Sequence, residues 1–395
     1  MSRVTLMRGD FSAEMLGLDQ EQYDNLAETV QQVYHVGSHV NNWLPYECLK
    51  NVNVEGTRRL LTLARTGRKK RFHYASTTTF SPDKEDQTVF LETDNIRPSD
   101  INKYNGYDIS KYVSEELCNL ARNEGYDCNI YRLVWVGGHH DTGLSKVNDG
   151  VNILLRILLT LGVYPKGYYM QDIVPVDLMA DAVASVQSKV SCKNFNVTSQ
   201  SNESIDMLKI VTMLQGMGYK LKEVSFQTFI DQMKAYPEEK WDEYCNSYRQ
   251  LIIRLYDEGI QSESFYDSQN MKEFLDDDVR KKLETKFVDD YFQKAVLYLV
   301  RNNALPTPSG GNYSEDVKRI AHWNDVPAHE YPLDKCVHKV FEGQVAKSPL
   351  ATAVVMDEES WTYEMLNCRA NQLAAYLRES GVKTGDFVGI CLDRS

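Results

Sequence analysis

The sequence predicts an α/β protein with a Rossmann-like parallel sheet, a helical subdomain after the sheet and a partial second α/β unit at the end. Three observations support this prediction. Short β-rich runs alternate with longer helical patterns over residues 1–200, and residues 203–303 are helical and acidic in pattern. A stretch rich in proline and glycine at 305–311 then separates a new globular pattern from the rest.

The alternation in residues 1–200 predicts parallel strand pairing, because helices of crossover length separate the strands and cover both faces of the sheet. Strands are expected at residues 33–36, 72–76, 129–136, 173–176 and 195–197. Helices are expected at residues 46–65, 106–124 and 151–163.

The remainder of the chain predicts a helical subdomain, a linker and a further unit. Residues 201–304 carry apolar residues at three- and four-residue spacing, which is typical of amphipathic helices. Helices are expected there at residues 207–217, 226–233, 241–256 and 289–300. A linker is expected over 305–332 and an incomplete unit over 333–395. The expected elements of this last unit are helices at 337–345 and 365–377 and strands at 353–355 and 387–392.

The composition excludes several classes of function. A net charge of −12 argues against a surface that neutralises nucleic-acid phosphates. The most apolar stretch, 151–163, contains Arg156 and is shorter than the roughly 20 residues of a membrane span. The eight cysteines include no CxxC pair, so we expect reduced thiols in the cytoplasm. We expect neither a nucleic-acid nor a membrane partner.

Two patterns of charged and metal-ligating residues are assigned to structure rather than chemistry. The basic run 68–71 predicts a solvated turn whose charges complement the dipole of the preceding helix. His35 and His39 lie across a strand end without a third ligand, and His139 and His140 are interpreted as loop residues. No metal site is therefore expected.

Tyr107 and Lys111 form the sharpest candidate site. They lie four residues apart at the start of a predicted helix, so both side chains can face one cleft. A free tyrosine has a pKa near 10, and a nearby ammonium would lower that pKa toward the working range of a proton donor. This spacing is a weak motif alone, and its place in a strand–helix–strand unit adds the information.

Hydroxyl and small residues follow two of the predicted strands. Thr77 lies in the run 76–79 at the end of the second strand, where a hydroxyl could hydrogen-bond a carbonyl that is being reduced. The alternative is a turn that satisfies its own backbone, and spacing alone does not decide between the two. Residues 37–39 follow the first strand and would let a cofactor approach the backbone.

An ordered series of motifs resembles one family. The series is Tyr34–Asn41, Asn53–Thr57, Phe72–Thr77, Tyr107–Lys111, Ile130–Arg132, Gly137–Gly138 and Pro175–Asp177. It is similar to the extended short-chain dehydrogenase/reductases and, among them, to the thioester reductase domains of nonribosomal peptide synthetases and of aminoadipate or carboxylic acid reductases. The resemblance covers residues 3–303. A second series, Trp323–Asp325, Trp361–Asn367, Arg369–Ala374 and Gly381–Asp386, resembles the opening of an amino-acid-activating adenylation domain.

The resemblance implies a function and a set of site residues. It implies NADPH-dependent reduction of a peptidyl or aminoacyl thioester, which an acyl carrier domain presents on its phosphopantetheine arm, with release of an aldehyde or an alcohol. Thr77 and Tyr107 would hydrogen-bond the developing oxyanion, Tyr107 as proton donor, and Lys111 would bind the nicotinamide ribose. The implied cofactor-binding residues are Asp10, Phe11, Gly37, Ser38, His39, Tyr107, Lys111, Leu133 and Val136.

One family feature is missing from this sequence. Residues 1–34 contain no glycine-rich turn of the kind that holds a cofactor pyrophosphate at a helix N-terminus. We therefore expect a fragment truncated at both ends, with weak NADPH affinity and no activity of its own. Two alternatives remain open: an extended short-chain dehydrogenase acting on a nucleotide sugar or other small carbonyl, and a non-catalytic remnant.

Overall fold

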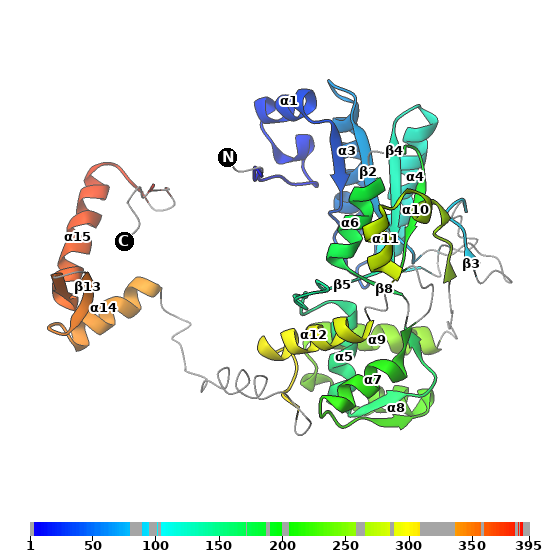
Figure 1. The fold of residues 1–395 in the computed structure, drawn as a ribbon. Helices are drawn as coiled ribbons and strands as arrows, with labels where there is room; N and C mark the ends of the chain where they lie inside the picture. The colour runs from blue at the N-terminus through cyan, green and yellow to red at the C-terminus, as the bar shows by residue number, and fades with distance from the viewer. Residues whose placement is uncertain are drawn as a thin grey trace. The chain divides into compact units, whose positions relative to one another are not determined.

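The chain forms two compact units, Met1–Asn324 and Asp325–Ser395, in a computed structural model (Figure 1). The described residues are 4–79, 89–94, 101, 104–170, 172–186, 190–199, 205–257, 265–284, 288–308, 336–356, 359–383, 386 and 388–389. Most of the predicted linker, 305–332, and most of the strand predicted at 387–392 lie outside these residues.

A four-stranded parallel sheet lies in the first unit and confirms the predicted fold class. Its strands, in spatial order, are β1 (Gln32–His35), β2 (Arg71–Thr77), β4 (Cys128–Leu133) and β9 (Asn194–Val197). The register aligns Thr77 with Leu133, so the carboxyl ends of β2 and β4 meet at one edge. Candidate site residues that follow the strands are thereby brought to that edge.

Helices lie beside the sheet (Figure 1). Two of them match the residue ranges that the apolar pattern predicts. The helix expected over 46–65 is formed by α2 (Tyr46–Lys50), a π-helical turn (Asn51–Glu55) and α3 (Gly56–Arg65). The helix expected over 106–124 is α4 (Gly106–Asn123), whose N-cap Asn105 accepts a hydrogen bond from the Asp108 backbone. The helix α6 (Val176–Val186) was not predicted.

Short strand pairs extend the first unit beyond the main sheet. The strand predicted at 129–136 divides into β4 and β5 (Trp135–Gly137), and β5 pairs in parallel with β8 (Ile173–Pro175). The other pairs are β3 (Val89–Phe90) with β12 (Phe265–Tyr266), β6 (Val163–Pro165) with β11 (Lys222–Val224), and β7 (Tyr169–Met170) with β10 (Ile205–Asp206).

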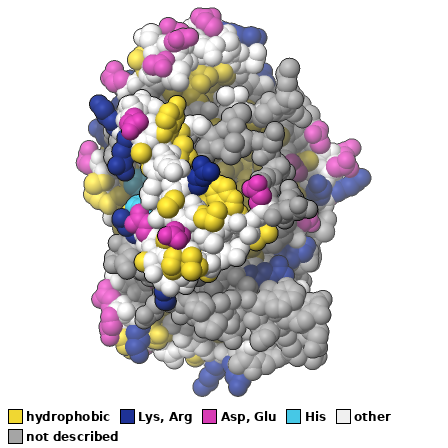
Figure 2. Space-filling view, turned by 90° about the vertical axis from the view of Figure 1, so that its left-hand side faces the viewer, with side chains coloured by type: hydrophobic (Ala, Val, Ile, Leu, Met, Phe, Trp, Pro, Cys, Tyr) yellow, Lys and Arg dark blue, Asp and Glu magenta, His cyan; other side chains and the backbone are white. Residues whose placement is uncertain are grey.

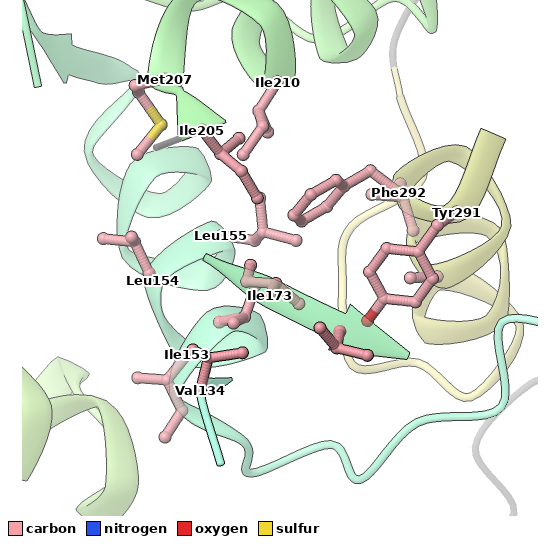
Figure 3. Close-up of a cluster of buried hydrophobic side chains, with 14 of the residues drawn as sticks. Val134, Ile153, Leu154, Leu155, Ile173, Ile205, Met207, Ile210, Tyr291 and Phe292 are labelled. Carbon is pink, nitrogen blue, oxygen red and sulfur yellow. The ribbon is translucent and has the colours of Figure 1, made fainter. Parts of the chain in front are cut away.

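The helical region shares one hydrophobic core with the sheet. This core joins Tyr131 and Phe195 of the sheet to helices on both sides of residue 200. Figure 3 shows part of it, where Leu155, Ile173 and Phe292 come from α5, β8 and α12. The helices are α5 (Gly150–Leu161), α7 (Met207–Gly216), α8 (Phe226–Ala235), α9 (Glu243–Asp257), α10 (Gln269–Phe274), α11 (Asp277–Glu284) and α12 (Val288–Arg301). Among the described residues, none of the helices has the length and apolarity of a bilayer span.

The N-terminal segment packs beside β1 and α3. A short 3-10 turn (Glu14–Gly17) precedes α1 (Gln20–Thr29), and a capping box between Asp19 and Gln22 begins that helix. Leu16 and Leu18 enter a second apolar cluster with residues of α3 and β2. This packing places residues 9–18 beside the end of β1.

The basic run 68–71 is not wholly solvated, so the interpretation of it as a solvated turn is wrong for Lys70. The Lys70 side chain is buried, and its Nζ donates to the backbone oxygens of Ala27, Thr66 and Arg68 at 2.6–2.8 Å. Those carbonyls end α1 and α3, where a cation complements the helix dipoles. The charge therefore has the expected electrostatic role from a buried position.

The described residues of the second unit form a β-hairpin and two helices. Its elements are α14 (Val337–Lys347), β13 (Thr352–Met356), β14 (Glu359–Thr362) and α15 (Tyr363–Glu379), and β13 pairs antiparallel with β14. Large hydrophobic side chains of this unit are exposed, among them Val337, Leu350, Val355, Leu373 and Tyr376.

On the face of the molecule in Figure 2, hydrophobic side chains lie among acidic and basic ones.

Candidate active site

The candidate residues lie where strands of the parallel sheet end and α4 begins. Residues 37–39 follow β1, Thr77 is the last residue of β2, and Tyr107 lies in the first turn of α4. Ligands of open parallel sheets bind at the carboxyl ends of the strands. The topology thus gathers residues that are up to 70 positions apart, from Gly37 to Tyr107, near one sheet edge.

The start of α4 is held by a close backbone contact at Gly106. A Cβ added to Gly106 would overlap the Leu44 carbonyl oxygen and would lie 2.5 Å from the Tyr46 backbone nitrogen. Only glycine therefore lets the first turn of α4 approach the chain that leads into α2. This contact fixes the position of Tyr107, the next residue.

The Tyr107 side chain is half-buried, and its phenol lies near the Ser38 hydroxyl. Burial and, to a smaller extent, the neighbouring Asp108 carboxylate raise the pKa of Tyr107 to about 12, against the opposite effect of the Ser38 hydroxyl. The phenol therefore stays protonated at neutral pH. Such a group can donate a proton or a hydrogen bond to an oxygen that gains negative charge.

The Lys111 ammonium lies one helical turn along α4 and points toward β2. Its Nζ donates to the Ala75 carbonyl at 2.5 Å and lies 4.3 Å from the centre of the Tyr74 ring. Burial lowers the pKa of Lys111 to about 8. The expected lowering of the Tyr107 pKa is not found, because burial governs the phenol and the ammonium is held against β2.

Thr77 is half-buried in a hydroxyl-rich turn. Its Oγ1 lies 2.8 Å from Thr79 Oγ1 and accepts a 3.3 Å hydrogen bond from the Thr79 backbone. These bonds are those of the self-satisfying turn that the sequence left open as an alternative. Thr77 follows Ala75 by two residues, so the strand that receives the Lys111 ammonium also carries this hydroxyl.

Asn53 connects the loop after β1 to α4, a role that was not predicted. Its side chain donates to Ser110 Oγ at 2.9 Å and to the His39 carbonyl at 3.1 Å, and accepts from the His39 backbone at 2.8 Å. The residue lies in the π-helical turn, a feature that often occurs at functional sites. A buried amide in an apolar helical pattern was the available signal.

A buried ion pair fixes α4 against two strands and was also not predicted. Glu115 of α4 pairs with Arg132 of β4 at 2.6 Å and accepts a 2.6 Å hydrogen bond from Ser76 of β2. Glu115 lies one turn beyond Lys111 on the same helix. The network therefore sets how far Lys111 and Tyr107 stand from the strand ends.

The N-terminal candidates divide into a packed residue and an exposed one. The Phe11 ring fills the space beside Gly37, where an added Cβ would lie 2.9 Å from Phe11 Cζ, and it meets the His35 ring edge-on at 5.4 Å. Asp10 is exposed, and hydrogen bonds from the Ser12 hydroxyl and backbone lower its pKa. The side of Gly37 where other residues carry a Cβ is thus occupied by the Phe11 ring.

Leu133 and Val136 lie farther along the sheet edge. The Leu133 carbonyl accepts hydrogen bonds from the backbone and hydroxyl of Thr78, and Val136 pairs with Val174 in the β5–β8 ladder. Both side chains are partly buried against the main core. Their observed contacts are therefore those of packing and backbone pairing.

Family models match both units of the chain. Residues 1–183 match a model of NAD-binding domains described as male sterility protein. Residues 341–395 match a model described as AMP-binding enzyme. The two matches agree in order and position with the two resemblances seen in the sequence.

Curated relatives include multidomain synthetases and a reductase. A linear gramicidin synthase protein of Brevibacillus parabrevis is 28% identical over 239 residues, which are 60% of this chain and 5% of that protein. Carboxylic acid reductase of Segniliparus rugosus is 30% identical over 242 residues, 56% of this chain and 20% of the reductase. The chain thus spans a quarter or less of the length of these relatives.

Solved structures with this fold include the terminal reductase domain of the myxalamid PKS-NRPS biosynthetic pathway. It has a TM-score of 0.67 and 24% identity, with 76% of each chain covered. A thiolation-reductase di-domain from an archaeal nonribosomal peptide synthetase has a TM-score of 0.57 and 18% identity, covering 75% of this chain and 61% of that one. These likenesses show the fold, while the family models and the curated relatives confirm the resemblance to a synthetase reductase domain followed by the start of an AMP-binding domain.

Proposed function

We propose that residues 1–304 are the reductase part of a nonribosomal peptide synthetase-like enzyme that reduces a carrier-bound acyl thioester with NADPH. The thioester C–S bond breaks, the carrier thiol leaves, and the acyl carbon becomes an aldehyde, which a second reduction would convert to an alcohol. The matches to a NAD-binding family and to a carboxylic acid reductase support this reaction class.

The observation that carries the proposal is the position of the Tyr107 phenol, in the first turn of α4 near the Ser38 hydroxyl. Reduction of a carbonyl places negative charge on its oxygen, and a donor fixed beside that oxygen stabilises the charge. Tyr107 keeps its proton because burial raises its pKa to about 12, and the Ser38 hydroxyl lies beside it. We assign Tyr107 as the proton donor, and Thr77 as a further hydroxyl for the same oxygen.

The polar groups at this edge fit the ribose and nicotinamide end of a dinucleotide. Two hydroxyls and one ammonium, from Ser38, Tyr107 and Lys111, are donors of the kind that ribose oxygens accept. When bound there, a nicotinamide cofactor supplies the reducing electrons. We propose that Lys111 binds the ribose and that its contacts to Ala75 and Tyr74 hold its ammonium in place.

The helical part and a carrier domain complete the proposal. Residues 201–304 share a core with the sheet, so they can form a fixed wall for an acyl chain. The thiolation-reductase di-domain is a solved case in which a carrier accompanies a reductase of this fold. We propose that a carrier domain presents the acyl group on a phosphopantetheine arm, and that residues 333–395 begin a domain that activates the next acid.

Replacement of Tyr107 by phenylalanine tests the assignment. The substrates are an acyl-phosphopantetheine thioester and a high concentration of NADPH, and the readout is aldehyde or alcohol by mass spectrometry. Because this chain is expected to be inactive alone, the test uses the reductase with an N-terminal glycine-rich turn restored. We expect product from that protein and from its control Tyr244→Phe, which removes an exposed phenol of α9, and a loss of about 100-fold or more with Tyr107→Phe. Equal turnover by Tyr107→Phe would refute the proton-donor role.

Binding measurements separate the proposed reaction from the sugar-directed alternative. Saturation-transfer NMR on the same chain compares the acyl-phosphopantetheine thioester with a nucleoside-diphosphate sugar, so it does not depend on turnover. We expect transfer to the thioester and its loss with a bulky change at the sheet edge, Ser38→Trp. Binding of the sugar nucleotide without the thioester would favour the alternative function.

A further inference from the structure

A cluster of imidazole and carboxylate groups lies at a second strand edge of the first unit. His139, His140 and Asp141 follow β5, and Asp177 follows β8, the parallel partner of β5. One ligand atom from each of His139, His140 and Asp141 lies within 4.8 Å of the other two. The two imidazole rings are parallel, with centres 5.7 Å apart.

The bonding of His140 is that of a metal ligand oriented by a carboxylate. Asp177 accepts a hydrogen bond from the His140 backbone at 2.9 Å and a second from His140 Nδ1, so Nε2 is the ring atom directed away from Asp177. Metal-binding histidines commonly donate one ring N–H to a carboxylate, which fixes the tautomer and leaves the other nitrogen to bind the ion. Asp177 holds His140 in this manner.

The distance from His140 Nε2 to the Asp141 carboxylate fits two ligands of one tetrahedral ion. His140 Nε2 lies 3.2 Å from Asp141 Oδ1. Metal–ligand bonds of about 2.1 Å at a tetrahedral angle place two ligand atoms about 3.4 Å apart. The pair therefore needs almost no movement to share an ion, and His139 is the adjacent third donor.

The surrounding structure holds this loop in place. The Gly138 backbone N–H donates to the Tyr291 hydroxyl at 2.7 Å, and the His140 carbonyl accepts from Lys294 Nζ at 3.4 Å. Gly143 has a φ of +68° and lies against the Lys294 backbone, where a side chain would overlap α12. A donor set fixed in this way loses little conformational freedom when an ion binds.

We propose that His139, His140 and Asp141 bind one divalent ion of the zinc class, with Asp177 as the positioning carboxylate of His140. Two imidazoles and one carboxylate suit zinc, cobalt or nickel, whereas magnesium and calcium prefer sets of oxygen atoms. A tetrahedral ion would keep one position for water. The competing state is a cluster of His140 with Asp177 and Asp141 that holds no metal.

The test is a titration of the tag-free chain with Co²⁺, followed by visible absorption, and with Zn²⁺, followed by calorimetry. The thiols are first alkylated, because Cys48, Cys192, Cys336 and Cys368 are exposed and would also bind these ions. We expect one ion per chain and the intense visible bands of tetrahedral cobalt. His140→Gln should abolish binding, and Asp177→Asn should weaken it about 10–100-fold. The control His338→Gln, a change in α14, should leave binding as it is.

The outcomes decide the proposal without any enzymatic assay. Absence of one-to-one binding, or binding that survives His140→Gln, would overturn it and favour the cluster that holds no metal. Should His140→Gln fail to fold, X-ray absorption of the cobalt-loaded, alkylated wild-type chain decides instead: imidazole ligands at about 2.1 Å support the site, and a shell of oxygen atoms alone refutes it.

Discussion

Glu115→Gln tests whether the buried pair with Arg132 holds α4 in place. The two side chains are only 4% and 5% exposed, and Glu115 accepts two hydrogen bonds from Arg132 and one from Ser76. Glutamine keeps the shape and one acceptor oxygen but leaves the buried guanidinium without a compensating charge. Loss of one partner from a buried ion pair costs about 3–5 kcal/mol. We expect the free energy of unfolding to fall by about 3 kcal/mol, the lower end of that range, because glutamine keeps one acceptor oxygen.

The assay is urea unfolding followed by circular dichroism, with the exposed pair Lys234–Asp257 as reference. That pair is 45% and 53% exposed, so Asp257→Asn should cost at most about 1 kcal/mol. The double variant Glu115→Gln/Arg132→Met should cost less than the sum of its single changes, because no buried charge is left unpaired. A loss below about 1 kcal/mol in Glu115→Gln would refute the reasoning.

Two further predictions concern the first turns of α4. Gly106→Ala should destabilise the chain by about 1–3 kcal/mol, because the new methyl group would overlap the Leu44 carbonyl. The control Gly216→Ala should be near neutral, because a Cβ there meets nothing within 4 Å. Equal unfolding midpoints of the two variants in urea would contradict this prediction. The Lys111 ammonium should titrate near pH 8 in a ¹³C-lysine NMR experiment, since burial lowers its pKa from 10.5, and a midpoint near 10.5 would show that it is solvated. Because the unfolded chain keeps that proton up to about pH 10.5, Lys111 should make the free energy of unfolding rise with pH between about 8 and 10.5, and Lys111→Met should remove that rise.

The sequence was most informative where local pattern and tertiary structure agree. The strands expected at 33–36, 72–76 and 195–197 differ from β1, β2 and β9 by one or two residues, because β-branched and aromatic runs between helices of crossover length leave few other pairings. The strand expected at 129–136 was one element in the sequence. It divides at Val134, where the chain leaves β9 as its partner and β5 pairs with β8, a change that only the fold determines.

The sequence places the candidate residues on their elements but does not show their contacts. Helical spacing places Tyr107 and Lys111 on one side of α4, but it does not show that the ammonium reaches across to Ala75. The Glu115–Arg132 pair joins residues 17 positions apart on different elements, and each residue alone looks like an ordinary surface charge. Lys70 illustrates the same limit, since its ammonium binds the remote Ala27 carbonyl of α1 as well as the local carbonyls of Thr66 and Arg68.

The environment of Tyr107 also bears on which chemistry the site could perform. A tyrosine whose pKa were lowered by an adjacent ammonium could donate or accept a proton near neutral pH. Here burial keeps the proton on the phenol, while the pKa of Lys111 falls to about 8, so the lysine loses its charge well before the tyrosine as pH rises. At neutral pH both groups keep their protons, so the site offers a phenol O–H and an ammonium to a carbonyl oxygen that gains negative charge.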